Sequence, residues 1–285
     1  MSQKDSPNGA QLTPISRTQQ TALTIIRPDT QVELAAIDPD AAARSSKRKG
    51  EKEAKKLAER LRELQQALYA EHTRSLLVVV QAMDTGGKDG AIAMLSAGLD
   101  LNGLHLTNFK FPSPEESEHD FLWRVHKATP AKGVTAIWNR SHYEDVLVPR
   151  VHEQISENEW QERCAAINAF ERLLVRNGTR VLKFFLHISK EEQKERLAAR
   201  LEEPHKLWKF NPDDLKERER WDDYQRAYDA VIDQTATEIA PWHVVSANRK
   251  WSRNLVMLET IVGALEEMNP QYPQASFDPE SVAIA

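Results

Sequence analysis

Short apolar runs alternate with longer segments of helical periodicity along most of the chain. The first clear helix is predicted over residues 47–71, where leucines recur at three- and four-residue spacing and form one apolar face. A continuous run of leucine and valine follows at residues 75–81. Such a run is typical of a strand that is buried on both faces of a parallel sheet.

The same alternation continues toward the C-terminus. Further strands are predicted at residues 106–111, 134–138, 181–188 and 242–245. Further helices are predicted at residues 91–99, 114–129, 157–177, within 190–240, and at 253–268. Strands that alternate with helices predict an α/β fold, in which a parallel sheet is covered by helices on both faces as a three-layer α/β/α sandwich.

The two ends of the chain differ from this pattern. Residues 1–45 are rich in Ser, Thr, Gln, Pro and Asp without sustained periodicity, so we expect a partly disordered N-terminal extension. Residues 46–270 are predicted to form a single domain, and residues 271–285 a C-terminal tail.

Composition narrows the classes of protein that fit. The chain has 285 residues with 38 Lys or Arg and 43 Asp or Glu, a formal net charge of −5, which argues against binding to nucleic acid. The single cysteine, Cys164, excludes an internal disulfide and a cysteine-rich zinc site. The longest apolar run, at residues 76–80, is far short of the ~20 residues that span a membrane. With no signal-peptide pattern at the start, we expect a cytoplasmic protein.

A glycine-rich turn lies between the strand at 75–81 and the helix at 91–99. A buried strand, such a turn carrying Lys, and a helix form the arrangement that cradles phosphate, because backbone N–H groups and the helix dipole point at the anion. The alternative is a structural turn that binds nothing. The candidate phosphate-binding residues are Gly86, Gly87, Lys88, Asp89 and Gly90.

Acidic residues accompany this turn and suggest a metal ion. The match to G-x-x-x-x-G-K-[ST] is imperfect, because Ala82 holds the first glycine position and Asp89 replaces Ser/Thr. Asp84 is a second acid beside the turn. Carboxylates would repel bound phosphates unless a cation lay between them, and Mg²⁺ binds through one or two carboxylates plus substrate phosphates.

A second candidate segment, residues 139–145, directly follows the strand predicted at 134–138. Ligands of open α/β sheets bind beyond the carboxyl ends of the strands, so we expect Arg140 and Asp145 to face the same crevice as Lys88. Arginine can hold a phosphoryl group in transfer, and aspartate can hold magnesium. The alternative is a surface loop in which Arg140 and Asp145 pair with each other.

Basic residues concentrate in two segments that should flank the turn. Residues 176–220 contain 12 Lys or Arg and 9 Asp or Glu, and residues 122–152 contain five and two. The functional interpretation is a mobile lid that closes over phosphates and excludes water. The alternative is an ordinary surface helix with i,i+4 pairs such as Glu192 with Arg196.

Four segments together resemble the polyphosphate kinase 2 family, and the resemblance covers about residues 30–270. The segments are residues 81–90, 119–124, 139–147 and 206–210. The resemblance implies a P-loop kinase fold with a helical lid at about 194–222. It also implies reversible, Mg²⁺-dependent transfer of the terminal phosphoryl group of inorganic polyphosphate to ADP. The chain is similar to class III of the family, which also phosphorylates AMP, and Asn139 replaces an aspartate found in class I.

The resemblance also implies residue roles. Lys88 would contact the transferred phosphate, Arg140 would stabilise it in flight, and Asp84 and Asp145 would serve magnesium, with Asn139 beside the nucleotide phosphates. The lid residues that would contact polyphosphate or nucleotide are Arg196, Arg200, Lys206 and Lys209. A homo-oligomer, either a dimer or a tetramer, is the implied assembly.

Two other functions remain open at this point. An ATP-dependent nucleotide or small-molecule kinase would use the same loop on the same fold. Its mark would be an adenine pocket beside the loop, whereas a polyphosphate donor requires an extended basic channel. A nucleotide-binding regulator without transfer activity would agree with the imperfect motif at Ala82 and Asp89. Arg140 and a basic lid would have no clear use in such a regulator.

Overall fold

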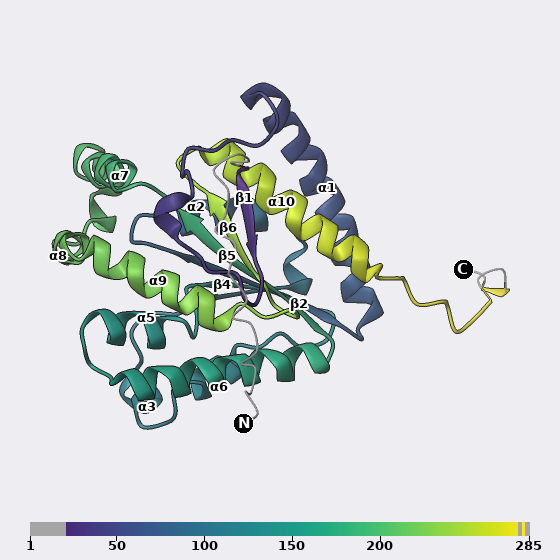
Figure 1. Cartoon of the computed structure of the whole chain (residues 1–285). Coiled ribbons are helices and arrows are strands. Elements are labelled where there is room, and N and C mark those ends of the chain that lie inside the picture. The colour runs from purple at the N-terminus through teal and green to yellow at the C-terminus, as the bar shows by residue number, and fades with distance from the viewer. Residues whose placement is uncertain (1–20, 279–280, 283–285) are drawn as a thin grey trace, which may run out of the picture.

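One six-stranded sheet runs through the described part of the computed structural model, which comprises residues 21–278 and 281–282 (Figure 1). The strands are β1 (Leu23–Ile26), β2 (Ser75–Ala82), β3 (Leu104–Asn108), β4 (Thr135–Asn139), β5 (Thr179–His187) and β6 (Trp242–Ser246). Their order across the sheet is β1-β6-β5-β2-β4-β3. Neighbouring strands pair in parallel except for β1 and β6, which are antiparallel.

β2 lies inside the sheet, and its sequence explains its position. All eight of its residues are buried, which requires cover on both faces and agrees with its continuous apolar run. In the register with β4, Val80 pairs with Asn139. The loops that follow β2 and β4 therefore start side by side at the same edge of the sheet.

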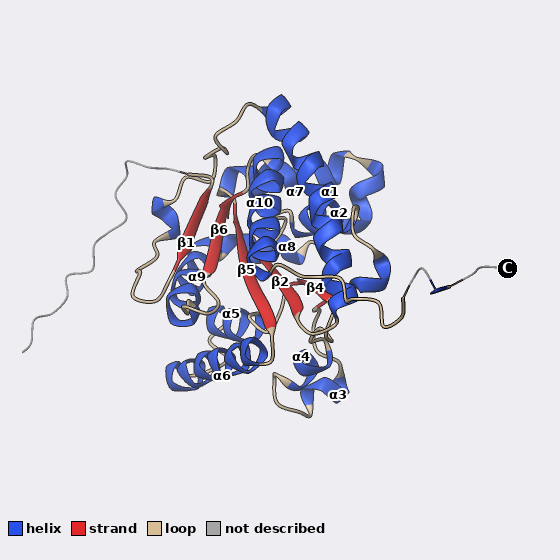
Figure 2. Ribbon diagram, turned by 90° about the vertical axis from the view of Figure 1, so that its right-hand side faces the viewer, coloured by secondary structure: helices blue, strands red, loops and turns tan. Residues whose placement is uncertain are grey.

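Helices cover both faces of the sheet (Figure 2). The α-helices are α1 (Lys47–Glu71), α2 (Lys88–Ser96), α3 (Pro114–Ser117), α4 (Trp123–Lys127), α5 (Glu144–Val151), α6 (Glu157–Arg176), α7 (Lys190–Glu202), α8 (Asp213–Glu219), α9 (Trp221–Thr235) and α10 (Lys250–Met268). Short 3-10 helices are η1 (Leu34–Ala36), η2 (Leu101–Gly103) and η3 (Pro204–Lys209). α1, α2 and α10 lie on one face, and α5, α6 and α9 lie on the other. The three-layer α/β sandwich predicted from the alternation is confirmed.

α1 and α10 pack closely at their N-terminal ends. Gly50 of α1 lies under the ring of Trp251, and a Cβ at this position would approach the ring carbon Cζ3 to 2.7 Å. A larger residue would force the two helices apart. Gly50 therefore fixes the first turns of α1 beside the first turn of α10.

Residues 21–45 differ from the predicted disordered extension, because they are part of the fold. β1 covers the edge of β6, and η1 packs nearby. The backbone N–H of Leu34 donates to Asp229, and Nε2 of His187 lies 3.1 Å from the carbonyl oxygen of Ile37. These contacts attach the segment to α9 and β5. The predicted extension over residues 1–20 lies outside the described residues.

Other differences concern helices. The helix predicted at 114–129 is two short helices, α3 and α4, and the region 190–240 divides into α7, η3, α8 and α9. α5, at Glu144–Val151, was not predicted; it contains Pro149, a residue that disfavours a helix interior. Residues 271–278 form neither helix nor strand. Among the helices of the described residues, none combines the length and apolar character that a membrane span requires.

Candidate active site

The loop between β2 and α2 has the backbone geometry of a tight turn that only glycine fits at two positions. Gly87, which precedes α2, has φ of 94°, in the left-handed region that favours glycine. A Cβ at Gly86 would approach the Cβ of Ala82 to 2.5 Å. Thr85 also has a positive φ, of 59°. The turn therefore brings the first backbone N–H groups of α2 to an open edge of the sheet, where an anion can reach them.

Lys88 is the first residue of α2 and is buried against the loop. Its ammonium donates to the carbonyl oxygens of Ala82, at 2.8 Å, and Met83, at 3.2 Å. Burial, followed by the nearby charge of Arg140, lowers the pKa of the lysine. Because carbonyl groups do not neutralise a buried ammonium, an anion bound beside Lys88 would be strongly favoured.

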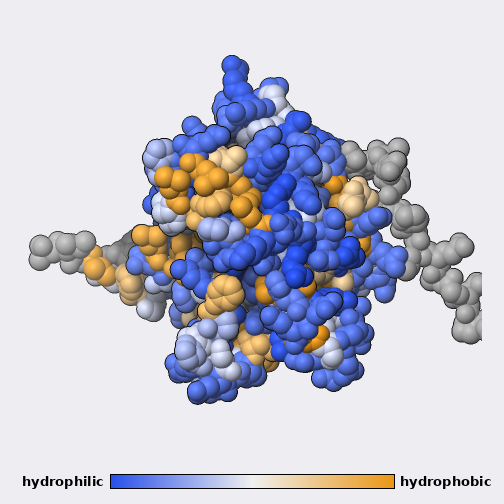
Figure 3. Space-filling model, turned by 90° about the vertical axis from the view of Figure 1, so that its left-hand side faces the viewer, coloured by the Kyte–Doolittle hydropathy of each residue, from blue (hydrophilic) through white to orange (hydrophobic). Residues whose placement is uncertain are grey.

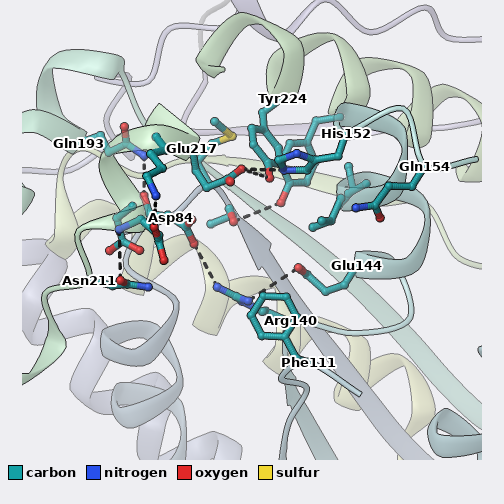
Figure 4. Close-up of a pocket in the computed structure, with 18 residues that line it drawn as sticks. Asp84, Phe111, Arg140, Glu144, His152, Gln154, Gln193, Asn211, Glu217 and Tyr224 are labelled. Atoms are coloured by element: carbon teal, nitrogen blue, oxygen red, sulfur yellow. Dashed lines mark hydrogen bonds and ion pairs between the residues drawn. The ribbon is translucent and has the colours of Figure 1, made fainter. Parts of the chain in front are cut away.

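Arg140 follows β4 directly and holds the centre of the site (Figure 4). Its φ of 62° is unusual for a residue with a side chain, and such conformations cluster at functional sites. The guanidinium lies 3.1 Å from a carboxylate oxygen of Asp84 and 3.9 Å from one of Glu144. The loops after β2 and β4 thus meet through an arginine between two acids.

The second predicted acid lies elsewhere. The carboxylate of Asp145 is 3.2 Å from Arg124, and Asp145 lines neither of the two pockets described below. Glu144, the preceding residue, takes the expected place beside Arg140. Burial raises the pKa of Glu144, although the charges of Arg140 and Lys88 oppose the shift. The predicted Asp145 side chain is therefore not brought to Lys88, and the alternative pairing of Asp145 with Arg140 is not seen either.

Two adjoining pockets meet at Asp84 and Arg140. We call the first the loop pocket, which has a volume of about 680 Å³ and contains the glycine-rich turn. The second, the side pocket, has a volume of about 410 Å³ and lies between α5, α8 and α9. Phe111, with 88% of its surface exposed, lines both pockets, as does Asp214.

The two pockets differ in charge. Of the described residues that line the loop pocket, nine are Lys or Arg and three are Asp. Of those that line the side pocket, two are Lys or Arg and five are Asp or Glu. The surface on the side of α7 and α8 is mainly hydrophilic, apart from separate apolar patches (Figure 3). The loop pocket is thus strongly basic in a protein whose formal net charge is −5.

The structure brings the predicted lid residues to the loop pocket. All four, Arg196, Arg200, Lys206 and Lys209, line it. Two of them pair with acids of the same pocket: Arg200 lies 3.0 Å from Asp214, and Lys209 lies 3.7 Å from Asp89. Lys206 lies 2.6 Å from Glu203. The lid segment therefore contacts the glycine-rich loop between β2 and α2, which we call the phosphate loop. The mobility of the lid stays a prediction.

The contacts of Arg196 agree with both interpretations of its helix, a surface helix with i,i+4 ion pairs and a lid over the phosphate loop. Its Nε donates to Glu192 at 2.7 Å, as expected of an ordinary helix surface. Its Nη1 also donates to the carbonyl oxygen of Thr85 at 3.2 Å, which attaches α7 to the phosphate loop.

Asn139 lies at the carboxyl end of β4 and faces the loop. Its side-chain amide donates to Asp89 at 2.9 Å. Asn139 also lines the loop pocket. Taken together, all residues predicted for the site except Asp145 line this pocket.

Sequence reasoning missed three basic residues of the loop pocket, Lys110, Lys250 and Arg253. Arg253 is almost completely buried, and its Nη1 donates to the carbonyl oxygen of Gly87 at 3.1 Å. Burial and the charge of Arg196 lower the pKa of Arg253 to about 10. Lys250 and Arg253 are remote from the recognisable motifs, so only the fold reveals their place, whereas Lys110 lies at the carboxyl end of a predicted strand and could have been found from that position.

This geometry defines a phosphate-binding α/β protein, and comparisons with known proteins identify its family. The family model described as polyphosphate kinase 2 matches residues 44–273. The AMP/ADP-polyphosphate phosphotransferase of Meiothermus ruber is 46% identical over 91% of this chain and 98% of its own. The ADP-polyphosphate phosphotransferase of Rhodopseudomonas palustris is 41% identical over 76% of this chain and 80% of its own.

A solved structure agrees with this result. The crystal structure of polyphosphate kinase 2 from Arthrobacter aurescens TC1 is 43% identical and superimposes with a TM-score of 0.88, covering 90% of this chain and 93% of the other. The chain belongs to the polyphosphate kinase 2 family.

Proposed function

We propose that this protein transfers the terminal phosphoryl group of inorganic polyphosphate to ADP, and also to AMP, in a reversible, Mg²⁺-dependent reaction. The excess of nine cationic over three acidic side chains around the phosphate loop carries the proposal. Polyphosphate has a negative charge on every unit, so a donor site for it requires such an excess. The names of the relatives from Meiothermus ruber and Rhodopseudomonas palustris, both polyphosphate phosphotransferases, support the same donor.

The two pockets suggest separate places for donor and acceptor. The terminal unit of polyphosphate would lie in the loop pocket on Lys88 and the N–H groups of α2. The nucleotide would lie in the side pocket, where apolar and aromatic side chains such as Phe111 and Tyr224 can contact a base. Arg140 lines both pockets and would stabilise charge on the phosphoryl group as it passes between them. The attacking phosphate oxygen is already ionised, so positioning and charge stabilisation suffice without a general base.

The acids at the junction fit a magnesium ion. Asp84 and Glu144 both lie beside Arg140, and no group of three or more metal-binding side chains occurs among the described residues. This pattern agrees with Mg²⁺, which is held by one or two carboxylates and completes its shell with substrate phosphates. Asp84 and Glu144 would hold the ion, in place of the predicted pair Asp84 and Asp145. The bound ion would neutralise charge on donor and acceptor oxygens.

The two alternative functions, an ATP-dependent kinase and a nucleotide-binding regulator, agree less well with the pockets. The loop pocket is dominated by Lys and Arg rather than by an apolar slot for adenine, which favours polyphosphate over ATP as donor. A regulator without transfer activity would gain nothing from Arg140 in its strained conformation between two pockets. Assembly into a homo-oligomer stays a prediction.

Product analysis would test the proposed function. The purified protein should convert ADP to ATP, and AMP to ADP and then ATP, when Mg²⁺ and polyphosphate are present without ATP. Chromatography of the nucleotides measures both products. If neither acceptor reacted with polyphosphate, but ATP served as donor to a nucleotide, the ATP-dependent kinase would replace this proposal.

Variants that neutralise Glu144 or Asp145 distinguish the roles of these two adjacent acids. The Glu144→Gln variant should lose on the order of 10²-fold in kcat, since one of the two carboxylates proposed to hold Mg²⁺ is removed. The matched Asp145→Asn variant should keep its activity and lose about 1–3 kcal/mol of the free energy of unfolding, because Arg124 loses its charged partner. Steady-state kinetics and denaturant unfolding measure the two effects. Equal activity losses in both variants would contradict this assignment.

The pH dependence of the activity is a second test of Glu144. Burial raises the pKa of Glu144, so its carboxylate takes up a proton at a higher pH than an ordinary glutamate. The activity of the wild type at limiting Mg²⁺ should therefore decline as the pH falls toward that raised pKa, because protons compete with the ion for the carboxylate. The Glu144→Gln variant should lack this decline.

A further inference from the structure

A second basic surface lies outside the loop pocket, between the N-terminal ends of α1 and α10. We call it the basic groove. Its positive charges come from Lys47, Arg48, Lys52 and Lys55 of α1 and from Lys250 of α10. Arg48, Lys52 and Lys55 share one face of the helix, because they recur at four- and three-residue spacing, and Lys47 begins the helix beside them.

Acidic groups offset little of the charge of the basic groove: Glu203 interacts electrostatically with Lys250 without forming an ion pair. None of these five residues forms an ion pair or a side-chain hydrogen bond with any other described residue, and Glu51 is the one acid among the described residues that line the groove. The first turn of α1 also contains no acidic residue, so its basic side chains oppose the helix dipole. A polyanion would relieve this repulsion.

The basic groove adjoins the loop pocket at one residue. Lys250 lines both. One turn further along α10, Arg253 donates to the carbonyl oxygen of Gly87 in the phosphate loop. The close contact of Gly50 with Trp251 holds the basic end of α1 beside this turn. A linear polyanion that leaves the phosphate loop therefore meets positive charge from Arg253 through Lys250 to α1.

We propose that the basic groove binds the distal part of a long polyphosphate chain whose terminal unit lies in the loop pocket. This inference rests on the proposed function. From Lys47 to Lys55 the groove extends about 12 Å along α1, at 1.5 Å per helical residue. It contacts units that do not react, so it strengthens binding equally before and during phosphoryl transfer. Such binding lowers KM for long chains and leaves kcat unchanged.

Charge reversal on α1 tests the basic groove. For the Lys52→Glu/Lys55→Glu variant we expect KM for long-chain polyphosphate to rise about tenfold, with a weaker dependence on salt. Its KM for hexaphosphate and its kcat with either donor should match the wild type, because a short donor stays within the loop pocket. The Lys56→Glu/Arg62→Glu variant is the matched control, since it makes the same charge change on exposed positions of α1 outside the groove.

The possible outcomes separate this inference from the proposed function. If KM for long chains did not change, or rose equally for hexaphosphate or in the control variant, the groove would not be a binding site for the distal chain. The proposed function would stand in each of these cases. A wild-type protein that used neither donor would overturn both, and circular dichroism would establish that the variants are folded.

Discussion

Replacement of Lys88 by alanine should reduce kcat for phosphoryl transfer by about 10²–10³-fold, the loss typical of one preorganised charge at a transition state. Lys88 follows the glycines of the phosphate loop directly, and its ammonium is fixed by the carbonyl groups of Ala82 and Met83. Its burial excludes water that would otherwise screen its charge. Single-turnover measurements with saturating polyphosphate and ADP would separate this loss from weaker donor binding.

The fold should tolerate the loss of Lys88. Its partners are the backbone carbonyl groups of Ala82 and Met83, which line the side pocket, so water can enter the space that the shortened side chain leaves and replace the ammonium. The Arg62→Ala variant, on the exposed surface of α1, is a suitable control. Turnover within a few-fold of the wild type in the folded Lys88→Ala variant would show that the loop does not hold the transferred group.

The Lys183→Met variant should lose about 3–5 kcal/mol of the free energy of unfolding, the usual result of leaving one member of a buried ion pair without its partner. Lys183 in β5 and Glu171 in α6 are both completely enclosed, at 0% and 1% exposure, with 2.8 Å between the ammonium and the carboxylate. The ammonium also donates to the hydroxyl of Tyr143 and the carbonyl oxygen of Thr235. Denaturant unfolding measures the change.

A double variant distinguishes the charge effect from a packing effect. In Lys183→Met/Glu171→Leu both charges are replaced by apolar side chains, so the protein should recover much of the stability lost by Lys183→Met alone. A double variant as unstable as the sum of the two single variants would show that packing, rather than the unpaired carboxylate, causes the loss. The catalytic rate of the folded fraction should be unchanged, since neither residue lines a pocket described above.

Local patterns predicted the parts of the fold whose cause is local. α1 follows from its regular leucines, and β2 with its loop follows from a continuous apolar run that ends in glycines. β1 was not predicted because a strand of four residues is too short to show a clear periodicity, and its pairing with β6 depends on residues more than 200 positions away. α5 was missed because residues 139–145 were interpreted only as a loop that follows a strand, and the eight-residue helix shows little periodicity.

The residues of the candidate site likewise divide into those that local motifs predict and those that they do not. The glycine-rich turn, Arg140 and the lid residues could be predicted because they lie in contiguous motifs. The choice between Glu144 and Asp145 could not, since adjacent residues of a helix point about 100° apart and either carboxylate could face the crevice. Lys250 and Arg253 reach the loop pocket only through the packing of α10 against α2.

The three aspartates of the loop pocket act as internal counter-ions. Asp84 faces Arg140, Asp89 faces Lys209, and Asp214 faces Arg200. An arriving phosphate must therefore displace a carboxylate from its Lys or Arg partner. The electrostatic free energy gained is then the difference between the new ion pair with phosphate and the old ion pair with aspartate. The exchange works in both directions: when a shortened polyphosphate leaves, each aspartate regains its cation. A pocket this basic can thus release a strongly charged product, which a reversible reaction with repeated turnover requires.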